Sequence, residues 1–442
     1  MMPLTRNDVH RIMRIVSERQ QENVEFLQQL VRVPTVNHPP RGNEKPAQEI
    51  IAHKLAEIGF QVDVFEPTEV PGIEAHPGWY QPSDIPRDYR GRPCVVGVMK
   101  GTGGGNSLIL NGHIDVVDPG PRELWMDDPF SGNIRGGKIY GRGVVDMKGG
   151  IAAMIMAAEC LKLSGYELEG DLVVESVVDE EMGGYNGTVA CLARGYEADA
   201  AIITEPTRLK VEPGTKGAIL YSVQVPGKSA HSNLWWRGVS ALDKALGIKV
   251  ALGAFERTRT KELRNHHLYG DQSIFPIPAL VDTVHFVQCG MFDLLAVPDS
   301  CRFSFMLEVL PGEDMHKVSR RLEKHLSEFF YSDPFLREHR PKIEKVAMRP
   351  IKPSQMSLDH PIIPVVQKAF RAVKNSQPKV CGFESACDAT IFNNYSKTPC
   401  LVFGPGDLSL AHRPDESLGI KELVDCTKIL SLSIAQFCGH KP

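Results

Sequence analysis

The segment from residue 171 to 178 constrains the fold more than any other part of the chain. It reads DLVVESVV, a nearly continuous apolar run. Such a run is typical of a strand buried on both faces, as in a largely parallel sheet covered by helices. A shorter run of the same kind spans residues 200–204, and helical patterns span residues 9–31, 46–58 and 148–163. Together these patterns predict an α/β domain with a mixed, largely parallel sheet flanked by helices.

The order of the predicted elements changes in the middle of the chain. There the patterns read strand, helix, strand, strand, helix, strand, over residues 218–225, 239–254, 280–287, 301–310, 314–330 and 342–346. This βαββαβ order indicates a small ferredoxin-like sandwich. Patterns of the first kind resume with a helix at residues 362–373 and a strand at 400–403. We therefore expect one domain made of residues 1–214 and 354–442, with a second domain inserted over residues 215–353. Two domains also suit a chain of 442 residues, because single cores rarely grow beyond about 300 residues.

A glycine-rich segment, GTGGGN at residues 101–106, separates two short strands predicted at 95–100 and 107–110. It lacks the Gly-Lys-Ser/Thr ending of a phosphate-binding loop, and it joins strand to strand rather than strand to helix. The segment is therefore predicted to be a hairpin turn.

Composition excludes several classes of partner. A formal net charge of −4 leaves no excess of basic residues to neutralise a phosphate backbone, so nucleic acid is not an expected partner. The most apolar helical stretch, residues 151–161, is far shorter than the roughly 20 residues needed to cross a bilayer, so no membrane span is expected. The ten cysteines form no CxxC pair and the N-terminus has no signal-peptide pattern. Reduced thiols in a cytoplasmic protein are the expectation.

Chemistry-bearing side chains follow the predicted strands. His113 and Asp115 come directly after the apolar residues 108–110, and a histidine that donates its second N–H to a carboxylate makes a well-oriented metal ligand. Taken alone, such a pair is more often an ordinary hydrogen bond. Further candidate ligands follow a glycine-rich turn or other strands, namely Asp146, Glu180, Glu181, Glu205 and His412. Because such side chains gather at the carboxyl edge of an open α/β sheet, we expect them to form one site.

Seven stretches between residues 111 and 416 carry a resemblance to a known family. They are NGHIDVV, YGRGVVDMKGG, ESVVDEEMGG, ITEPT, PGKSAHS, ESACDATIF and VFGPGDLSLAHRPDE. In content and order they resemble the M20 metallopeptidases, which include acetylornithine deacetylase, succinyl-diaminopimelate desuccinylase, aminoacylase and glutamate-releasing carboxypeptidase. The resemblance implies a hydrolase that uses two bound metal ions to cleave an amide bond.

The resemblance also implies a role for each candidate residue. One metal site would be completed by His113 and Glu205, the other by Glu181 and His412, with Asp146 as the bridge, Asp115 orienting the first histidine and Glu180 as general base. Imidazoles and carboxylates without thiolates suit two Zn²⁺ ions, with Co²⁺ or Mn²⁺ as workable substitutes. The base must accept a proton from water and return it to the leaving nitrogen, which requires a carboxylate beside the metals but not bound to them.

The resemblance also implies that residues 1–214 and 354–442 form the catalytic domain and that residues 215–353 form a lid and dimerisation domain. The lid carries one further candidate. His231, in GKSAHS, resembles a histidine that donates a hydrogen bond to the oxyanion, in several relatives from the partner subunit of a dimer. The alternative is a surface histidine on a turn. The apolar stretch Leu234–Trp236 and an exposed sheet edge offer a surface for a homodimer, although the tryptophans could instead pack on their own domain. Leu295 and Glu308 stand where relatives often carry an Asn and an Arg that grip a substrate carboxylate, so that clamp is not expected.

The leading hypothesis is a dinuclear zinc-dependent amidohydrolase that removes an acetyl, formyl or succinyl group from a small N-acylated amine or amino acid. The alternative is an M20-type dipeptidase or carboxypeptidase, which the same metal centre could serve. A third hypothesis is a non-catalytic relative that binds a ligand, which the loss of a metal ligand or of the base would favour. All six of those positions are filled in this sequence.

Overall fold

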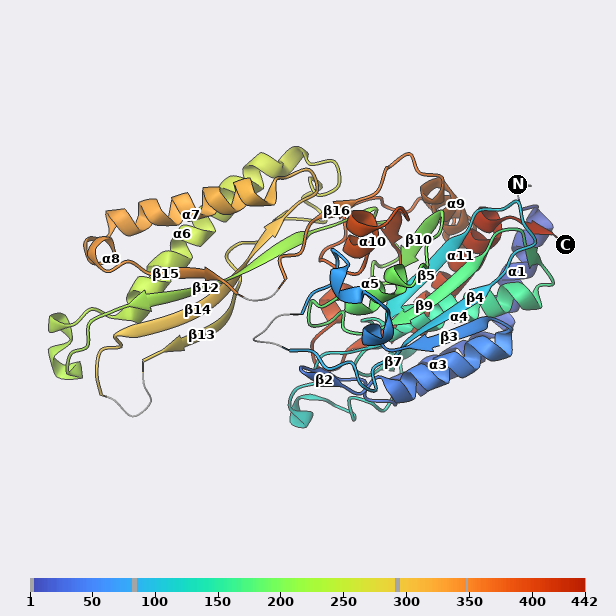
Figure 1. The fold of residues 1–442 in the computed structure, drawn as a ribbon, viewed down its shortest axis with the longest axis horizontal. Helices are drawn as coiled ribbons and strands as arrows, with labels where there is room; N and C mark the ends of the chain where they lie inside the picture. The colour runs from blue at the N-terminus through green and yellow to red at the C-terminus, as the bar shows by residue number, and fades with distance from the viewer. Residues whose placement is uncertain (1–3, 82–85, 291–294, 347–348, 442) are drawn as a thin grey trace. The chain divides into compact units, whose positions relative to one another are not determined.

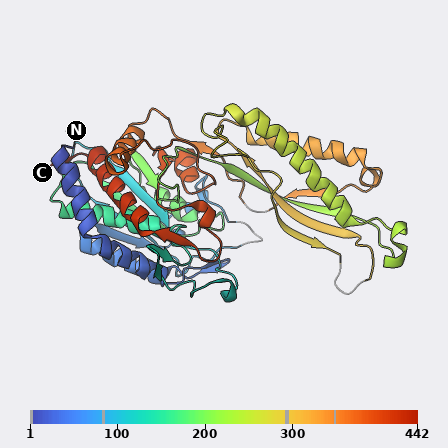
Figure 2. The same ribbon diagram turned by 180° about the vertical axis from the view of Figure 1, so that it is seen from behind.

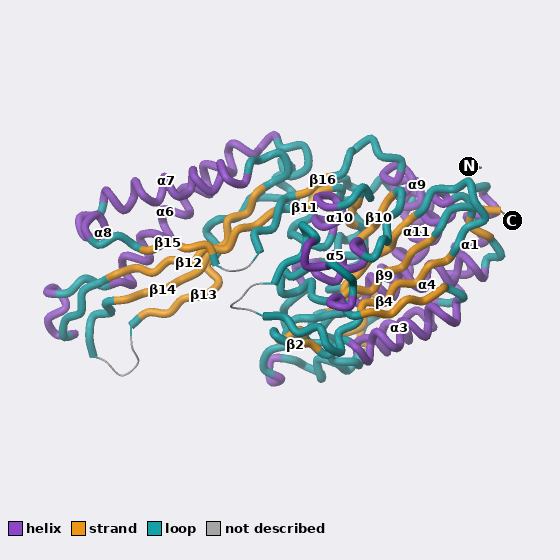
Figure 3. Tube along the Cα trace, viewed as in Figure 1, coloured by secondary structure: helices purple, strands orange, loops and turns teal. Residues whose placement is uncertain are grey.

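The structure is a computed structural model that describes residues 4–81, 86–290, 295–346 and 349–441. The chain divides into two compact units, the first made of Met1–Thr215 and Gln355–Pro442, the second of Lys216–Ser354 (Figure 1). Helices and strands alternate in the first unit, whereas the second unit gathers its strands into a separate antiparallel sheet (Figure 3). The mixed α/β fold class predicted from the sequence is confirmed.

The first unit is built on a six-stranded sheet with the order β17-β10-β5-β9-β4-β3. The strands are β3 Gln61–Phe65, β4 Cys94–Met99, β5 Leu108–His113, β9 Leu172–Val177, β10 Ala200–Ile203 and β17 Cys400–Val402. From β17 to β9 neighbouring strands are parallel, and β4 runs antiparallel to both of its neighbours. The carboxyl ends of β5, β9 and β10 therefore meet at one edge of the sheet.

Helices cover both faces of this sheet (Figures 1 and 2). One face carries α1 Arg6–Glu18, α2 Gln20–Val31, α3 Lys45–Ile58, α4 Lys148–Leu163, α9 Ile362–Lys374 and α11 Ile420–Cys438, and the other carries α5 Asn186–Ala193 and α10 Ala389–Tyr395. Side-chain alternation along β5 follows this arrangement: Asn111 donates to Thr188 of α5, whereas a Cβ on Gly112 would lie 3.1 Å from Ile151 of α4.

Several two- or three-residue strands complete the first unit and its connections. They are β1 Asn37–His38, β2 Arg41–Gly42, β6 Ile134–Arg135, β7 Lys138–Tyr140, β8 Glu167–Leu168, β11 Gly214–Thr215, β16 Ser354–Gln355, β18 Ser417–Gly419 and β19 His440–Lys441. The chain leaves the first unit at β11 and returns to it at β16.

The hairpin predicted at the glycine-rich segment is wrong. Strands β4 and β5 are not partners, because β9 lies between them and pairs with both. The segment instead crosses the end of β9 and passes very close to the backbone. A Cβ on Gly105 would lie 1.7 Å from the carbonyl oxygen of Cys438, and one on Gly101 would lie 2.4 Å from that of Glu169. Close packing therefore requires glycine at positions 101 and 105, whereas Gly103 and Gly104 have open space around them and positive φ values of 96° and 97°.

Two helical predictions differ from the structure. The single helix expected over residues 9–31 is two helices, because Arg19 leaves the helical conformation with ψ near 14° and at once serves as the N-cap of α2. The long helix α11 is not predicted at all from the sequence. Its residues are buried on nearly every side, so it lacks the polar stripe by which an amphipathic helix is found.

The second unit is a four-stranded antiparallel sheet with the order β13-β14-β12-β15. Its elements are β12 Gly217–Pro226, α6 Ala241–Glu262, β13 Val284–Cys289, β14 Ser300–Val309, α7 Met315–Ser332, α8 Pro334–Glu338 and β15 Lys342–Lys345. This confirms the βαββαβ order, with α8 as an added turn. The core lies between the sheet and α6 and α7, where the rings of Tyr221 and Phe305 stack with centroids 5.2 Å apart.

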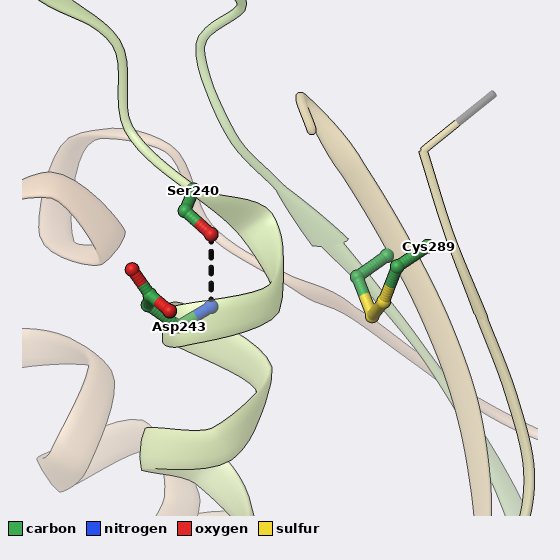
Figure 4. The surroundings of a disulfide bond; sticks show 4 residues. Ser240, Asp243 and Cys289 are labelled. Atoms are coloured by element: carbon green, nitrogen blue, oxygen red, sulfur yellow. Dashed lines mark hydrogen bonds between the residues drawn. A yellow bond between two sulfur atoms is a disulfide. The ribbon is translucent and has the colours of Figure 1, made fainter. Parts of the chain in front are cut away.

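The expectation that all cysteines are reduced is wrong for one pair. Cys289 and Cys301, on neighbouring strands of the second unit, form a disulfide (Figure 4). The other eight cysteines are free and buried, as expected. Among the described residues, no helix combines the length and the apolar character needed to span a membrane.

Candidate metal centre

His113 is the last residue of β5 and is completely buried. Its Nδ1 lies 2.9 Å from the backbone carbonyl oxygen of Asp115. Because a carbonyl oxygen can only accept, the proton is assigned to Nδ1 and the lone pair to Nε2. That Nε2 lies 3.1 Å from Asp146 Oδ1 and 3.4 Å from Glu205 Oε1. The orientation of the imidazole is the one that a metal ligand requires.

A second group of ligand-type atoms shares Asp146 with the first. His412 Nε2 lies 2.9 Å from Glu181 Oε2 and 3.4 Å from Asp146 Oδ2. Within each group the candidate ligand atoms all lie within 4.8 Å of one another. Asp146 therefore offers one oxygen to each group, which is the arrangement of a bridging carboxylate between two ions. The five residues proposed as ligands are brought together by the fold.

Glu180 stands beside these groups without belonging to either. It follows β9, is buried, and places Oε2 3.8 Å from His113 Nε2. Its neighbour Glu181 is a member of the second group. Adjacent carboxylates thus take different positions, one among the candidate ligands and one alongside them.

The carboxylate of Asp115 binds the backbone of the turn that carries Glu180 and Glu181, a contact that was not predicted from the sequence. It accepts hydrogen bonds from the backbone N–H groups of Glu180 and Glu181, at 3.3 and 3.2 Å, and from Asn37 Nδ2 at 2.8 Å. Its Oδ1 is 3.7 Å from His113 Nδ1, farther than the backbone carbonyl that this nitrogen reaches. Asp115 therefore orients the imidazole through its carbonyl and fixes the Glu180–Glu181 turn through its carboxylate.

Asp146 is held by a buried ion pair that the sequence analysis also missed. Glu416 Oε2 accepts from Arg142 Nη1 at 2.5 Å, and Glu416 Oε1 accepts from the N–H groups of Val145 and Asp146 at 2.8 and 3.3 Å. Both charged residues lie inside stretches that carry the family resemblance, YGRGVVDMKGG and VFGPGDLSLAHRPDE. Their position in these motifs could have marked both residues as candidates. The sequence alone does not show that they form a pair, because the pairing depends on the fold.

A second buried network supports the turn before Glu180. Asp179 has a positive φ of 70° and forms an ion pair with Arg87. Tyr89 donates its hydroxyl to Asp179 Oδ2 at 2.6 Å, and Asn186 Nδ2 donates to that hydroxyl oxygen at 2.6 Å. A left-handed conformation is uncommon outside glycine, and these bonds fix it here.

The electrostatics of the cluster favour a bound cation. Burial raises the pKa of Glu205 to about 8 and that of Glu181 to about 7, and it raises the pKa of Glu180 well above the usual range. Hydrogen bonds to Asp146 and Glu181 raise the pKa of His412 to about 11. In the absence of metal, four carboxylates therefore compete for protons and for two imidazoles.

The residues fit a pair of divalent ions. Glu181 Oε1 is buried and has no hydrogen-bond partner, so one carboxylate lone pair in the cluster is unsatisfied. The donor set holds only imidazole nitrogens and carboxylate oxygens, which suits Zn²⁺, Co²⁺ or Mn²⁺. Divalent cations would compensate both the excess negative charge and the unsatisfied oxygen.

His231 belongs to the second unit and to neither ligand group. It is exposed, forms the N-cap of a 3₁₀ turn, and accepts a hydrogen bond from Asn233 N–H through Nδ1 at 3.2 Å. Leu295 is 82% exposed, whereas Glu308 is buried and accepts from Lys216 Nζ at 2.8 Å. The catalytic role of His231 stays a prediction.

The family model for peptidase family M20/M25/M40 matches residues 109–436, about three quarters of the chain. The chain belongs to this family. The identification made from the sequence motifs is therefore confirmed.

Proteins with curated names resemble this chain over most or nearly all of its length. The N-formyl-4-amino-5-aminomethyl-2-methylpyrimidine deformylase of Bacillus subtilis is 28% identical over 98% of both chains. The enzyme of the same name from Halalkalibacterium halodurans is 30% identical over 96% of both. An acetylornithine deacetylase from Myxococcus xanthus is 29% identical over 78% of this chain and 84% of its own.

Solved structures share the fold at lower identity. Human carnosine dipeptidase 1 matches with a TM-score of 0.71 and 16% identity, over 97% of this chain and 99% of its own. The dipeptidase Dug1p from Saccharomyces cerevisiae matches with a TM-score of 0.74 and 15% identity, over 98% and 99%.

Proposed function

We propose that this M20 family member is an amidohydrolase that removes an acyl group from a small N-acylated amine. It would use two bound divalent ions, with Zn²⁺ as the first choice of metal. The observation that carries the proposal is the pair of ligand groups that share Asp146, with Glu180 buried beside them and outside both. A metal-dependent hydrolase of this kind needs metal ligands and a separate general base in one place, and this cluster contains candidates for both. Residues 1–214 and 354–442 would act as the catalytic domain and residues 215–353 as the lid.

His113 and Glu205 would hold one ion, Glu181 and His412 the other, and Asp146 both. When bound, the ions would polarise the substrate carbonyl and make water more acidic. Glu180 would take the proton from the attacking water and return it to the leaving nitrogen, cleaving the C–N bond. Its burial serves this role, because a raised pKa brings a carboxyl group closer to the pKa that a proton carrier needs near neutral pH.

His231 would donate a hydrogen bond to the oxyanion as the carbonyl becomes tetrahedral. It would reach the cluster by closure of its own lid or from the partner subunit of a cytoplasmic homodimer. Exposed apolar side chains in the second unit support self-association. Phe286 and Val287 on the edge strand β13 are 49% and 58% exposed, and Trp235 and Trp236 are 68% and 62% exposed.

The acyl group is best proposed as formyl, with an aminomethyl-pyrimidine as the amine. Support comes from the two full-length relatives with deformylase names. The second unit adds an independent reason. Glu308 stands where a carboxylate-binding arginine would be expected. It is a buried acid that forms an ion pair with Lys216, so this position supplies no positive charge for an amino-acid carboxylate.

The test is a substrate panel assayed with the zinc-loaded protein. It should contain N-formyl and N-acetyl aminomethyl-pyrimidines, N-acetylornithine, N-succinyl diamines and simple dipeptides. We expect the highest kcat/KM on an N-formyl amine without an α-carboxylate. A preference for dipeptides would support the peptidase alternative, and activity on none of these compounds would contradict the proposal.

A further inference from the structure

Two cysteines face each other across neighbouring strands of the second unit. Cys289 ends β13, Cys301 lies near the start of β14, and the two are direct partners in the antiparallel register with Cα atoms 4.1 Å apart (Figure 4). Cys301 is fully buried, whereas Cys289 is partly exposed at the end of the edge strand. The disulfide joins the two strands in the register that they already share, so forming or reducing it requires no change of strand partner.

The disulfide closes the base of the connection that leads from β13 to β14. The residues next to the two cysteines on the side of this connection are also paired, since Gly290 N–H donates to Ser300 O at 2.9 Å. The part of the connection from residue 295 to 299, which we call the strap, follows on the β14 side. Cys289 and Cys301 are 12 positions apart in the sequence, so the bond closes a short covalent ring.

The strap holds the segment that carries His231. Ala296 of the strap forms an antiparallel bridge with His231 itself. On either side of the bridge, Val297 N–H donates to Ala230 O at 2.8 Å and Ser232 N–H donates to Leu295 O at 3.1 Å. Both neighbours of His231 are thus fixed to the strap through their backbones.

The same strap fastens both ends of residues 227–241, which we call the His231 segment. Gly227 N–H donates to Asp299 O at 2.7 Å, and Ala241 N–H, at the start of α6, donates to Pro298 O at 2.8 Å. The packing is tight, because a Cβ on Gly227 would lie 2.8 Å from the carbonyl oxygen of Pro298. Ser240, the N-cap of α6, adds a hydrogen bond from Asp243 N–H at 3.2 Å (Figure 4).

We infer that Cys289 and Cys301 are a reversible dithiol–disulfide pair whose oxidation state sets how firmly the strap holds His231. The inference rests on the proposed role of His231 in the reaction. With the disulfide formed, the end of the edge strand and the strap are tied to β14. With the thiols reduced, the end of β13 is free to fray, and the strap is tied to the sheet through β14 alone.

The oxidant is a low-molecular-weight disulfide of the glutathione type. One cysteine thiolate attacks it, which forms a mixed disulfide and releases one small thiol. The second cysteine then attacks the protein sulfur of the mixed disulfide and releases the second small thiol. Two protein thiols are oxidised to one disulfide while one small disulfide is reduced to two thiols, and excess small thiol reverses both steps.

The structural test uses the full-length protein equilibrated with oxidised or reduced glutathione. Peptide mapping should find the Cys289–Cys301 disulfide in the first condition and not in the second. Hydrogen exchange at peptides covering residues 228–233 and 295–299 should be on the order of tenfold faster in the reduced protein. Cys289→Ser should show the fast exchange in both conditions. Absence of the disulfide after oxidation, or equal exchange in the two states, would overturn the inference.

The activity test separates this inference from the proposed function. We expect kcat to fall severalfold on reduction in the wild type, to stay at the reduced level in Cys289→Ser, and to be insensitive to redox state in His231→Ala. Equal kcat in the two states of the wild type would overturn the link to His231. If the protein had no amidohydrolase activity in either state, the proposed function would fail, and hydrogen exchange alone would decide whether the pair controls the strap.

Discussion

The metal cluster and the His231 segment are stabilised in different ways. Every candidate ligand except His412 is largely buried, and the backbone around Asp146, Glu180 and Glu181 is fixed by carboxylates that are themselves buried. His231 is exposed, and within the described part of the chain its side chain has one hydrogen bond, from the nearby Asn233 N–H. Its surroundings depend on backbone pairing with the strap.

The difference shows which candidate catalytic groups have their geometry fixed by neighbouring residues and which do not. A catalytic group works best when the groups around it fix its geometry before substrate binds. The first unit satisfies this condition by itself, at the carboxyl ends of β5, β9 and β10. The second unit presents its candidate donor on an exposed turn, so lid closure or docking of a partner subunit would have to order it under the proposed function.

The largest expected effect comes from removing the residue that the two ligand groups share. Asp146→Ala should abolish activity and reduce the bound zinc from two ions per chain to at most one, because neither group then keeps its third ligand. Metal analysis after saturation with zinc measures this directly. Two tightly bound ions in the variant would show that Asp146 does not bridge, and a wild type that binds one ion would rule out the dinuclear site.

The next effect tests whether the buried cluster contains a base distinct from its ligands. Glu180→Gln should keep both metal ions while kcat falls by on the order of 10²–10⁴, because the amide cannot accept the proton of water. Glu123→Gln, an exposed acid elsewhere in the same unit, should leave kcat unchanged. Loss of metal together with activity would mean that Glu180 and Glu181 have exchanged roles.

Sequence reasoning worked best where local patterns determine structure. The buried strand β9, the βαββαβ order of the second unit and the amphipathic helices α3 and α7 each carry a periodicity that can be read without the fold. The candidate ligands could be found because each follows a strand or a glycine-rich turn. Helix α11 could not be found in this way, because its burial on nearly every side removes the periodicity.

Long-range pairings account for what the sequence analysis missed. Gly105 looked like part of a turn, and only the position of β9 between β4 and β5 shows that it is a crossing. Glu416 lies 274 residues from Arg142 in the chain, and Cys289 recognises Cys301 only through the register of two strands. No local pattern encodes such partners, because they depend on which strands become neighbours.

A smaller effect is expected from the exposed side of the comparison. His231→Ala should lower kcat by about 10²–10³ with little change in metal content, because a hydrogen bond to the oxyanion would be lost while the cluster stays intact. His316→Ala, an exposed histidine on α7 of the same unit, is the matched control and should have wild-type kcat. A fully active His231→Ala would remove His231 from the mechanism.

The route by which His231 reaches the cluster can be distinguished in mixed dimers. If the donor comes from the partner subunit, combining His231→Ala chains with Glu180→Gln chains should restore part of the activity, because some mixed dimers contain one intact composite site. No recovery in heterodimers whose formation has been verified would contradict the partner route. Closure of the lid within one chain would then be the remaining route.

The smallest effect sharpens the comparison from within the buried cluster, at Asp115. Its carboxylate accepts from the N–H groups of Glu180 and Glu181, and an asparagine there would have one acceptor oxygen fewer and would turn an NH₂ group toward donors. Because the carbonyl that orients His113 is unchanged, Asp115→Asn should cost about 10–100-fold in activity or in metal affinity rather than abolish either.

A structural defect in Asp115→Asn would lower the melting temperature, whereas a positioning defect should weaken zinc binding or lower kcat at an unchanged melting temperature. Asp118→Asn, an exposed acid on the same connection, is the control and should match the wild type in all three measurements. Wild-type zinc affinity and kcat in Asp115→Asn would show that the Glu180–Glu181 turn keeps its shape without this carboxylate, and the contrast between a tightly fixed cluster and a loosely held donor would then be weaker than the structure indicates.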